Sequence, residues 1–321
     1  NNGEIISLVS LPDYNPNNRS SSGMEVLRNK SVTDVFEPGS TIKPFTLAMA
    51  LASGHFSTET PIPTGPGVYR IGKHQISDIK DYGVLSFSGV LVKSSNVGTV
   101  KIALELAPEE LYRTLSAVGF GEVSGVELPG EIDGSLVKRE RWRPIEHATL
   151  SYGYGLASTQ VQLARAYSVL ASGGILRPVT LRHRSASVPG QRVLSKPTVQ
   201  QINMLLEKVV SAEGTAKKAA VPAYRVAGKT GTVHKPSPSG GYDEDRYQSI
   251  FVGFAPVSNP RFVLAVMVDE PQGKYFGGEV AAPVFARIMS DALRFNGIKP
   301  DANTASGITI VAHPVETEAG A

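Results

Sequence analysis

Three short groups of polar residues, widely separated in the chain, carry side chains suited to acyl transfer. They are Ser40-Thr41-Ile42-Lys43, Ser94-Ser95-Asn96 and Lys229-Thr230-Gly231-Thr232. A serine hydroxyl attacks a carbonyl group efficiently only when a neighbouring base removes its proton. Serine followed three residues later by lysine, then a Ser-x-Asn triplet and then Lys-Thr-Gly, is a motif set of enzymes that form an acyl-serine intermediate. The order of the three groups therefore predicts Ser40 as the nucleophile.

The first group opens a segment with the periodicity of a helix. From Thr41 to Ser53, apolar residues recur at three- and four-residue steps, and Gly54 ends the pattern. Residues three apart on a helix share a face, so we expect Lys43 beside the Ser40 hydroxyl. Burial would lower the pKa of Lys43 toward the neutral form that a base needs, and the Ser40 amide in the first turn could hold an oxyanion. Alone, this group fits a helix-capping serine and an exposed lysine equally well.

The other two groups have side chains suited to proton transfer and substrate binding. Ser94 could relay a proton between Lys43 and a leaving amine, and Asn96 could hold the lysine or the substrate backbone. Lys229 has a positive charge, and a glycine in its strand lets a ligand approach closely. Such an edge can pair with an extended peptide and bind its terminal carboxylate. The candidate catalytic residues are Ser40, Lys43, Ser94 and Asn96, and the candidate binding residues on this strand are Lys229, Thr230, Gly231 and Thr232.

The Ser-x-x-Lys pattern occurs a second time, at Ser77-Asp78-Ile79-Lys80. This copy lies in a Pro- and Gly-rich stretch, residues 61–82, which predicts loop with short strands. No apolar helix follows Ser77, whereas Ser40 opens a strongly periodic one behind Pro38-Gly39. We therefore expect Ser77 to be a surface residue without a catalytic role.

The remaining pattern predicts a mixed α+β fold. Strands are predicted at residues 4–10, 224–233, 248–254 and 261–268. Helices are predicted at residues 41–53, 87–106, 108–118, 159–172, 197–211 and 281–294. The last three strands form an antiparallel meander, and the first strand is expected to join them. From Asp301 a polar and poorly ordered tail is expected.

Composition excludes several other kinds of site. The chain of 321 residues has no cysteine, which removes disulfides, thiolate metal sites and cysteine nucleophiles. Its histidines show no i, i+4 pair, so we expect no metal site, and we expect no cofactor. The net charge of +3 comes from scattered residues, so no nucleic-acid partner is predicted. No apolar run reaches the roughly 18 residues of a membrane helix, and the abrupt opening on Asn1-Asn2-Gly3 suggests that upstream sequence has been removed.

The runs around the three groups are similar to class B penicillin-binding proteins. The resemblance is carried by residues 35–45, 93–98 and 227–232, and it extends to residues 127–131, 152–156, 275–278 and 282–285. It covers roughly residues 3–300, and in its detail it is greatest for the division-specific branch of the family in Gram-negative bacteria. The family implies the penicillin-binding and β-lactamase-like fold, an antiparallel sheet flanked by helices with an all-helical subregion. It also implies a transpeptidase domain at residues 1–300, truncated at its N-terminus, and a tail at residues 301–321.

The resemblance implies a reaction and a set of roles. Ser40 would be acylated by the penultimate D-Ala of a peptidoglycan stem peptide, and a second stem-peptide amine would then form the cross-link. β-Lactam antibiotics would acylate the same serine. The amides of Ser40 and Thr232 would form the oxyanion hole, and Lys229, Thr230 and Thr232 would bind the carboxylate. An aromatic wall would line the cleft, formed by Tyr152, Tyr154, Tyr247, Tyr275 and Phe276.

The family context also implies partners and a location. The full-length form would act in septum formation with the septal glycan polymerase and other division proteins, at the periplasmic face of the inner membrane, through an anchor absent from this chain. A D,D-carboxypeptidase remains an alternative because only the acceptor differs. A serine β-lactamase would need a second base that the sequence does not reveal, and its interval from Ser94 to Lys229 would be unusually long. A non-catalytic β-lactam sensor would need a signalling apparatus outside this chain.

Overall fold

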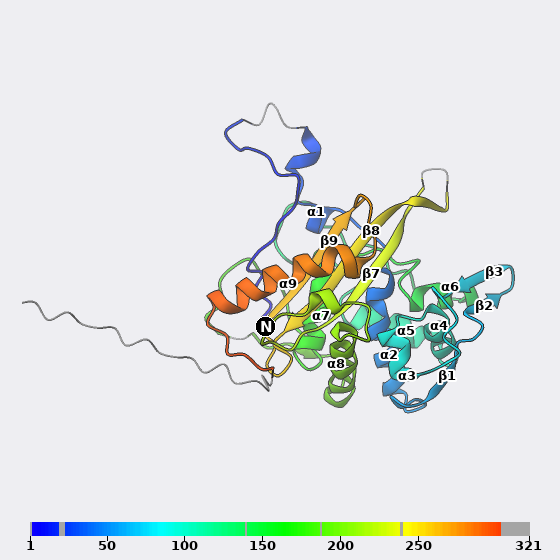
Figure 1. Cartoon of the computed structure of the whole chain (residues 1–321). Helices are drawn as coiled ribbons and strands as arrows, with labels where there is room; N and C mark the ends of the chain where they lie inside the picture. The colour runs from blue at the N-terminus through cyan, green and yellow to red at the C-terminus, as the bar shows by residue number, and fades with distance from the viewer. Residues whose placement is uncertain (1, 19–22, 139, 187, 238–239, 303–321) are drawn as a thin grey trace, which may run out of the picture.

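The centre of the molecule is a three-stranded antiparallel sheet. The computed structural model describes residues 2–18, 23–138, 140–186, 188–237 and 240–302. The strands are β7 (Ala227–Pro236), β8 (Tyr242–Ala255) and β9 (Phe262–Asp269), in the order β7-β8-β9 (Figure 1). Among the described residues, β7 is therefore an edge strand of this sheet, with one side free of strand pairing. The predicted meander is confirmed.

Helices pack against this sheet and bury its apolar side chains. The last helix, α9 (Gly277–Phe295), crosses in front of the sheet in Figure 1, and its Phe285 ring meets Phe251 of β8 edge to face at 4.7 Å. Behind the sheet lies α7 (Gln160–Ala171), whose Gln160 side chain donates to the Ala265 carbonyl of β9 at 2.8 Å. Further helices that pack on this core are α2 (Lys43–Ala52) and α8 (Lys196–Val210).

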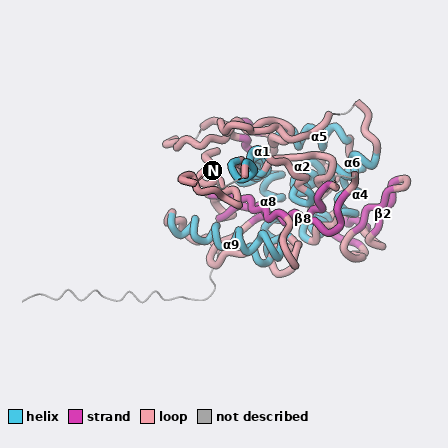
Figure 2. The backbone as a smooth tube through the Cα atoms, turned by 90° about the horizontal axis from the view of Figure 1, so that it is seen from above, coloured by secondary structure: helices cyan, strands magenta, loops and turns pink. Residues whose placement is uncertain are grey.

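A second group of elements forms a mainly helical subregion beside the sheet. The resemblance implied an all-helical subregion, and the structure adds two pairs of short strands to it. Figure 2 shows α2, α4, α5 and α6 gathered on the side of the molecule away from α9. Its helices are α3 (Phe87–Val92), α4 (Asn96–Leu104), α5 (Pro108–Ala117) and α6 (Pro144–Ser151). Two antiparallel strand pairs accompany them. The outer pair is β1 (Pro61–Pro63) with β4 (Val84–Ser86), and the hairpin between these strands is β2 (Val68–Ile71) with β3 (His74–Ser77).

The smaller elements lie near the N-terminus and around the sheet. They are α1 (Lys30–Thr33), β5 (Ile175–Leu176), β6 (Gln191–Arg192), and 3₁₀ turns at Met24–Leu27, Gly39–Ile42 and Lys217–Ala219. No helix within the described ranges combines the length and the apolarity needed to cross a bilayer.

One large hydrophobic core joins the sheet to the helical subregion, and α2 runs through it. Phe45 of α2 is fully buried and meets Phe120 and Tyr167 edge to face, at 6.1 and 5.6 Å between ring centroids. The Tyr167 hydroxyl donates to the carbonyl of Thr41 at 2.8 Å. The buried ring therefore fixes the start of α2, the part of the fold that carries the first polar group.

The predicted strand at residues 4–10 is wrong, and so is its expected place beside the late strands. Only Glu4 makes a bridge, an isolated parallel one with Thr180. Ile5 and Leu8 pack on a small cluster separate from the main core, whereas Ile6 and Val9 are 72% and 68% exposed. The apolar run indicated burial, but its neighbour in space is an irregular loop, which cannot continue a ladder.

The predicted helix at residues 87–106 is two helices, α3 and α4, with the second polar group between them. The break occurs at Ser94, whose φ of 60° is incompatible with a right-handed helix. Ser95 then caps α4, because its hydroxyl oxygen accepts from the amide of Gly98 at 2.8 Å. Helical periodicity continues on both sides of the break, which is why the pattern indicated one helix.

The other predicted helices are confirmed within a few residues of their bounds, and the loop stretch at 61–82 with short strands is also confirmed. The sequence did not predict α6. At the far end, the two carboxylate oxygens of Asp301 accept from the amides of Arg225 at 2.7 Å and Ser258 at 3.0 Å. The predicted tail lies outside the described residues from position 303 onward.

Candidate active site

Ser40 lies in a 3₁₀ turn that leads directly into α2. The turn spans Gly39–Ile42, and the Lys43 amide donates to the Ser40 carbonyl. Ser40 is partly exposed, whereas Lys43 is completely buried. Gly39 has a φ of +53°, and a Cβ there would lie 2.3 Å from Cγ1 of Val233 on β7. A glycine at this position therefore lets the turn lie tightly against the edge strand.

The amine of Lys43 is held by the second polar group. Its Nζ donates to the Ser94 carbonyl at 2.6 Å, to Asn96 Oδ1 at 2.7 Å, and lies 3.3 Å from the Ser94 hydroxyl. Burial lowers the pKa of Lys43 well below its ordinary value, the positive charge of Lys229 lowers it further, and the negative charge of Asp78 partly opposes both. The side chain is therefore fixed in place and biased toward its neutral form.

The Ser94 hydroxyl also contacts the third polar group. Lys229 Nζ donates to Ser94 Oγ at 2.9 Å and to the Thr230 carbonyl at 3.2 Å. Lys229 is completely buried, and burial lowers its pKa to about 7. One hydroxyl group thus lies between two lysine amines from different parts of the fold. Lys43, Ser94, Asn96 and Lys229 are thus joined by hydrogen bonds, and Ser40 lies in the turn directly before Lys43.

The turn that carries Ser94 is held by a residue that the sequence analysis left without a role, Asp78. Its Oδ2 accepts from the Ser95 hydroxyl at 2.6 Å, and its Oδ1 accepts from the amides of Asn96 at 2.5 Å and Val97 at 3.1 Å. Asp78 follows Ser77, the last residue of β3, in the second Ser-x-x-Lys pattern. Ser77 is exposed as predicted, but its carbonyl accepts from Asn96 Nδ2 at 3.0 Å.

The edge strand β7 lies beside the turn of Ser40. A Cβ at Gly231 would lie 3.1 Å from Cγ2 of Thr41 and 3.2 Å from the Pro38 carbonyl, so this glycine permits the close approach. The Thr232 hydroxyl accepts from the Gly277 amide at 2.9 Å, which leaves its own proton available for a ligand. The hydroxyls of Thr230 and Thr215 are 3.0 Å apart. The part of β7 that contains the four predicted binding residues therefore lies beside the turn of Ser40.

The predicted aromatic residues form two clusters. Tyr247 and Tyr275 stack at 4.1 Å between ring centroids, and Phe276 lies 4.6 Å from Tyr275. Tyr152 and Tyr154 form a second pair at 5.4 Å, and burial raises the pKa of each to about 12. Both pairs lie against segments that flank the turn of Ser40, but each has its own packing partners.

Two residues that the sequence analysis did not single out join these clusters. The His234 ring on β7 lies 4.5 Å from Tyr247, and its backbone hydrogen-bonds to Tyr154. Tyr242, at the start of β8, meets Tyr154 edge to face at 5.4 Å. His234 therefore links the two clusters into one row, through its ring to Tyr247 and through its backbone to Tyr154.

Glu37, three residues before Ser40, ties this row to the Ser40 turn. Its Oε1 accepts from the Gly155 amide and its Oε2 from the Tyr242 hydroxyl, both at 2.8 Å. The Gly39 amide donates to the Gly153 carbonyl at 3.1 Å, and a Cβ at Gly153 would lie 2.1 Å from the Gly39 carbonyl. The run at 152–155 is thus packed directly on the turn.

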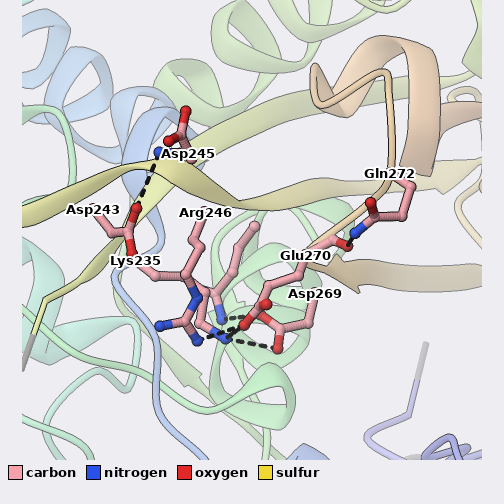
Figure 3. Close-up of polar contacts among 8 residues, drawn as sticks. Lys235, Asp243, Asp245, Arg246, Asp269, Glu270 and Gln272 are labelled. Carbon is pink, nitrogen blue, oxygen red and sulfur yellow. Dashed lines mark hydrogen bonds and ion pairs between the residues drawn. The ribbon is translucent and has the colours of Figure 1, made fainter.

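Ion pairs fix the strand ends beyond this row (Figure 3). Lys235 bonds to Asp269 at 2.8 Å and to Glu270 at 2.6 Å, and Arg246 also bonds to Glu270 at 2.6 Å. Hydrogen bonds from Arg246 and Lys235 lower the pKa of Glu270 to about 2. The charges balance, so this group links the three strands rather than forming an ion site. Across the described residues, no three His, Asp or Glu side chains are grouped to hold a metal.

Comparison with known proteins gives the family. Residues 1–290 match the model for the penicillin-binding protein transpeptidase domain. The chain belongs to this family. It is 44% identical over 305 residues to the peptidoglycan D,D-transpeptidase FtsI of Escherichia coli K12, covering 95% of this chain and 51% of that protein. It is 42% identical over 300 residues to the probable peptidoglycan D,D-transpeptidase PbpC of Pseudomonas aeruginosa, covering 93% and 53%.

A solved structure gives the same result for the fold. The transpeptidase domain of penicillin-binding protein 3 from Burkholderia pseudomallei matches with a TM-score of 0.82 and 45% sequence identity, covering 86% of this chain and 84% of that one. The predicted family and fold class are therefore confirmed. The chain spans about half the length of the curated relatives it matches.

The transpeptidase domain also contains site residues that sequence reasoning missed. These are Glu37, Asp78, Thr215, His234 and Tyr242. Glu37 lies inside a run that carried the family resemblance, and Asp78 lies inside the rejected second Ser-x-x-Lys pattern. The other three have no local signal, because their positions beside the site depend on contacts between distant segments.

Proposed function

We propose that this domain is a peptidoglycan D,D-transpeptidase that works through an acyl-serine at Ser40. The observation that supports it most is the buried network in which Lys43 and Lys229 both contact the Ser94 hydroxyl, beside the turn of Ser40. Such a network holds a neutral base and a cation at fixed positions next to a partly exposed serine. A base and a cation are the two groups that acyl transfer from a peptide with a free carboxylate requires.

In the acylation step, Lys43 removes the Ser40 proton. Ser40 Oγ then bonds to the carbonyl carbon of the penultimate D-Ala, and the amide bond to the terminal D-Ala breaks. The proton passes through Lys43 and the Ser94 hydroxyl to the leaving amine, and Asn96 orients the lysine. The amides of Ser40 and Thr232 stabilise the oxyanion, a contribution of about 10²–10³ in rate per donor.

Substrate binding would use β7. The stem peptide lies along the free edge of this strand, and its terminal carboxylate is bound by Lys229 together with the hydroxyls of Thr230 and Thr232. A carboxylate beside Lys229 favours the protonated amine, which offsets the lowering of its pKa by burial. The aromatic residues Tyr152, Tyr154, Tyr247, Tyr275 and Phe276 border the bound peptide. In the second step, an acceptor amine attacks the acyl-enzyme and restores Ser40.

The wider assignment follows from the relatives. We propose that residues 1–300 form the transpeptidase domain and residues 301–321 a tail. The FtsI relatives are named peptidoglycan D,D-transpeptidases. We therefore propose a role in septal cell-wall synthesis, at the periplasmic face of the inner membrane. There the full-length protein works with a septal glycan polymerase and other division proteins.

Intact-protein mass spectrometry after addition of a β-lactam tests the nucleophile. We expect one stable adduct on the wild type and on Ser77→Ala, the matched control from the second Ser-x-x-Lys pattern, and none on Ser40→Ala. A transient adduct with consumption of the drug would indicate a β-lactamase, and absence of any wild-type adduct would refute the acyl-serine assignment. A pentapeptide donor with an amine acceptor then separates the reactions. A transpeptidase gives the ligated product, whereas a carboxypeptidase gives only hydrolysis.

A further inference from the structure

Ser77 and Asp78, after β3, hold Asn96 by its backbone and its side chain. Asp78 Oδ1 accepts from the Asn96 amide at 2.5 Å, and the Ser77 carbonyl accepts from Asn96 Nδ2 at 3.0 Å. Asn96 Oδ1 is then left to accept from Lys43 Nζ at 2.7 Å. With the side-chain nitrogen bound to Ser77, the amide cannot turn over and present donors to the lysine.

The Ser95 hydroxyl completes this connection from inside the protein. Ser95 is only 1% exposed, and its oxygen accepts from the Gly98 amide at 2.8 Å. Its proton is therefore directed to Asp78 Oδ2 at 2.6 Å. Both oxygens of Asp78 thus act as acceptors, which is the pattern of an ionised carboxylate.

The turn that Asp78 holds is one that the chain would not adopt by itself. Ser94 has a φ of 60°, a left-handed conformation that a residue with a Cβ rarely adopts. Such a conformation persists only where surrounding contacts impose it. The Ser94 carbonyl and Asn96 Oδ1, on either side of Ser95, are the two acceptors closest to Lys43 Nζ. Any shift of this turn therefore moves the amine.

We propose that Asp78 is a positioning residue for acyl transfer: through Ser95 and Asn96 it sets the place of the Lys43 amine and the Ser94 hydroxyl. This inference rests on the proposed function, because it assigns Asp78 to the same reaction. The described hydrogen bonds of Asp78 go to Ser95, Asn96 and Val97 and not to Ser40 or β7, so its effect passes through these neighbours.

The charge of Asp78 gives a second, separable effect. Two charged groups act on Lys43: Lys229 from β7, which lowers the pKa, and Asp78, which raises it. Removing the carboxylate should therefore lower the pKa of Lys43 further. The acid limb of the acylation rate, where Lys43 becomes protonated, would then move to lower pH. A residue that only capped α4 would not shift this limb.

The experiment measures the second-order rate constant for acylation by a fluorescent penicillin between pH 5 and pH 9. We expect Asp78→Asn to slow acylation by about tenfold and Asp78→Ala by about 100-fold, each with its acid limb at lower pH than in the wild type. Asp81→Asn is the matched control. This substitution removes a carboxylate from the same loop between β3 and β4. Because the only described bond of Asp81 is to the Gly83 amide, the acylation rate constant and the pH of its acid limb should stay at their wild-type values. Thermal unfolding checks that each variant is folded. If Asp78→Ala does not fold, the result for Asp78→Asn alone tests the inference.

A double-mutant cycle tests the route through Asn96. In an Asn96→Ala background, Asp78→Asn should cost less than its roughly tenfold effect in the wild type, because one of the two side chains it positions is already absent while the bond to Ser95 remains. If the rate losses of the two single variants multiplied fully in the double variant, the route through Asn96 would be overturned. An Asp78→Asn protein with wild-type rate and an unmoved acid limb would overturn the inference while leaving the proposed function intact. A wild-type protein that the penicillin does not acylate would instead refute the proposed function, and this inference with it.

Discussion

The chain contains the Ser-x-x-Lys pattern twice, and the two copies have different surroundings. At the first copy, Ser40 lies in a 3₁₀ turn and Lys43 begins α2 with no exposed surface. At the second copy, Ser77 ends β3, and both Ser77 and Lys80 are exposed. The amine of Lys80 lies 5.4 Å from the Tyr82 ring centroid, at the surface.

The comparison shows that backbone conformation and burial, rather than the pattern, determine the chemistry of these residues. A helical turn places residues three apart on one face, whereas an extended segment followed by a turn does not. Burial then lowers the pKa of Lys43, whereas Lys80 is exposed and its amine lies near the Tyr82 ring. The second copy still contributes to the site, because the Ser77 carbonyl and the residue after it hold Asn96.

The largest predicted difference between the copies is in the two lysines. We expect Lys43→Ala to reduce the acylation rate constant by about 10³–10⁴, since it removes the base for Ser40. Lys80→Ala should stay within twofold of the wild type. Stopped-flow or gel-based acylation by a fluorescent penicillin measures both. Equal effects of the two substitutions would mean that the buried position of Lys43 has no special role.

The next effect is a bell-shaped pH dependence of acylation. The rate constant should rise with pH as Lys43 loses its proton, well below the ordinary pKa of a lysine. It should fall above about pH 7 as Lys229 loses the proton that carboxylate binding requires. In Lys229→Arg the falling limb should disappear, because arginine remains charged, and in Lys80→Ala the profile should not change. A constant that climbs without a maximum to pH 10 would contradict the assignment.

A smaller effect concerns stability: removal of the Lys229 amine should stabilise the folded protein, although it abolishes acylation. The pKa of Lys229 is about 7 in the folded protein and 10.5 for an ordinary lysine, so between these values the unfolded chain binds more protons. The contribution of Lys229 to the free energy of unfolding therefore rises with pH through this window. At pH 6, Lys229→Met should be more stable than the wild type by about 1–4 kcal/mol, although acylation is lost.

Urea unfolding at pH 6 and pH 9 measures this gain, which should shrink at the higher pH. Lys80→Met is the matched control, with a change within about 0.5 kcal/mol at either pH because its amine is already in water. A destabilised Lys229→Met at pH 6 would show that the contacts of the amine with Ser94 and Thr230 outweigh its desolvation.

Local sequence signals predicted much of this architecture. The helix predicted at residues 159–172 is α7, Gln160–Ala171, because a capping box at Thr159 and a pair of glycines mark its ends. The three late strands were predicted from their β-branched and aromatic residues. In the site, order and spacing singled out Lys43, Ser94, Asn96 and Lys229, which hydrogen bonds join in the fold, and Ser40 in the turn before Lys43. Their catalytic roles stay predictions.

The remaining features depend on contacts between distant segments. The first part of β8 is the polar run from Tyr242, and it is a strand because it pairs with β7, with Pro236 opposite Tyr242. The left-handed turn at Ser94 interrupts an otherwise helical pattern, and the bonds of Asp78 that accompany it come from a hairpin about 17 residues earlier. No local propensity encodes such partners, so the sequence alone does not identify them.

The smallest predicted effect concerns the hydrogen bond between Tyr242 and Glu37, which lies beside the Ser40 copy of the pattern. The Tyr242 hydroxyl donates to Glu37, whose other oxygen accepts from Gly155, so the start of β8 is linked to the segment that precedes Ser40. Tyr242 is 46% exposed, and one such hydrogen bond contributes about 0.5–1 kcal/mol. Tyr242→Phe should therefore slow acylation by about two- to fivefold while leaving the pH profile in place. Tyr82→Phe, beside the second copy, should not change the rate. If Tyr242→Phe matched the wild type as well, the bond of Glu37 to the Gly155 amide and the packing of Gly39 on Gly153 and Val233 would be sufficient to hold the Ser40 turn.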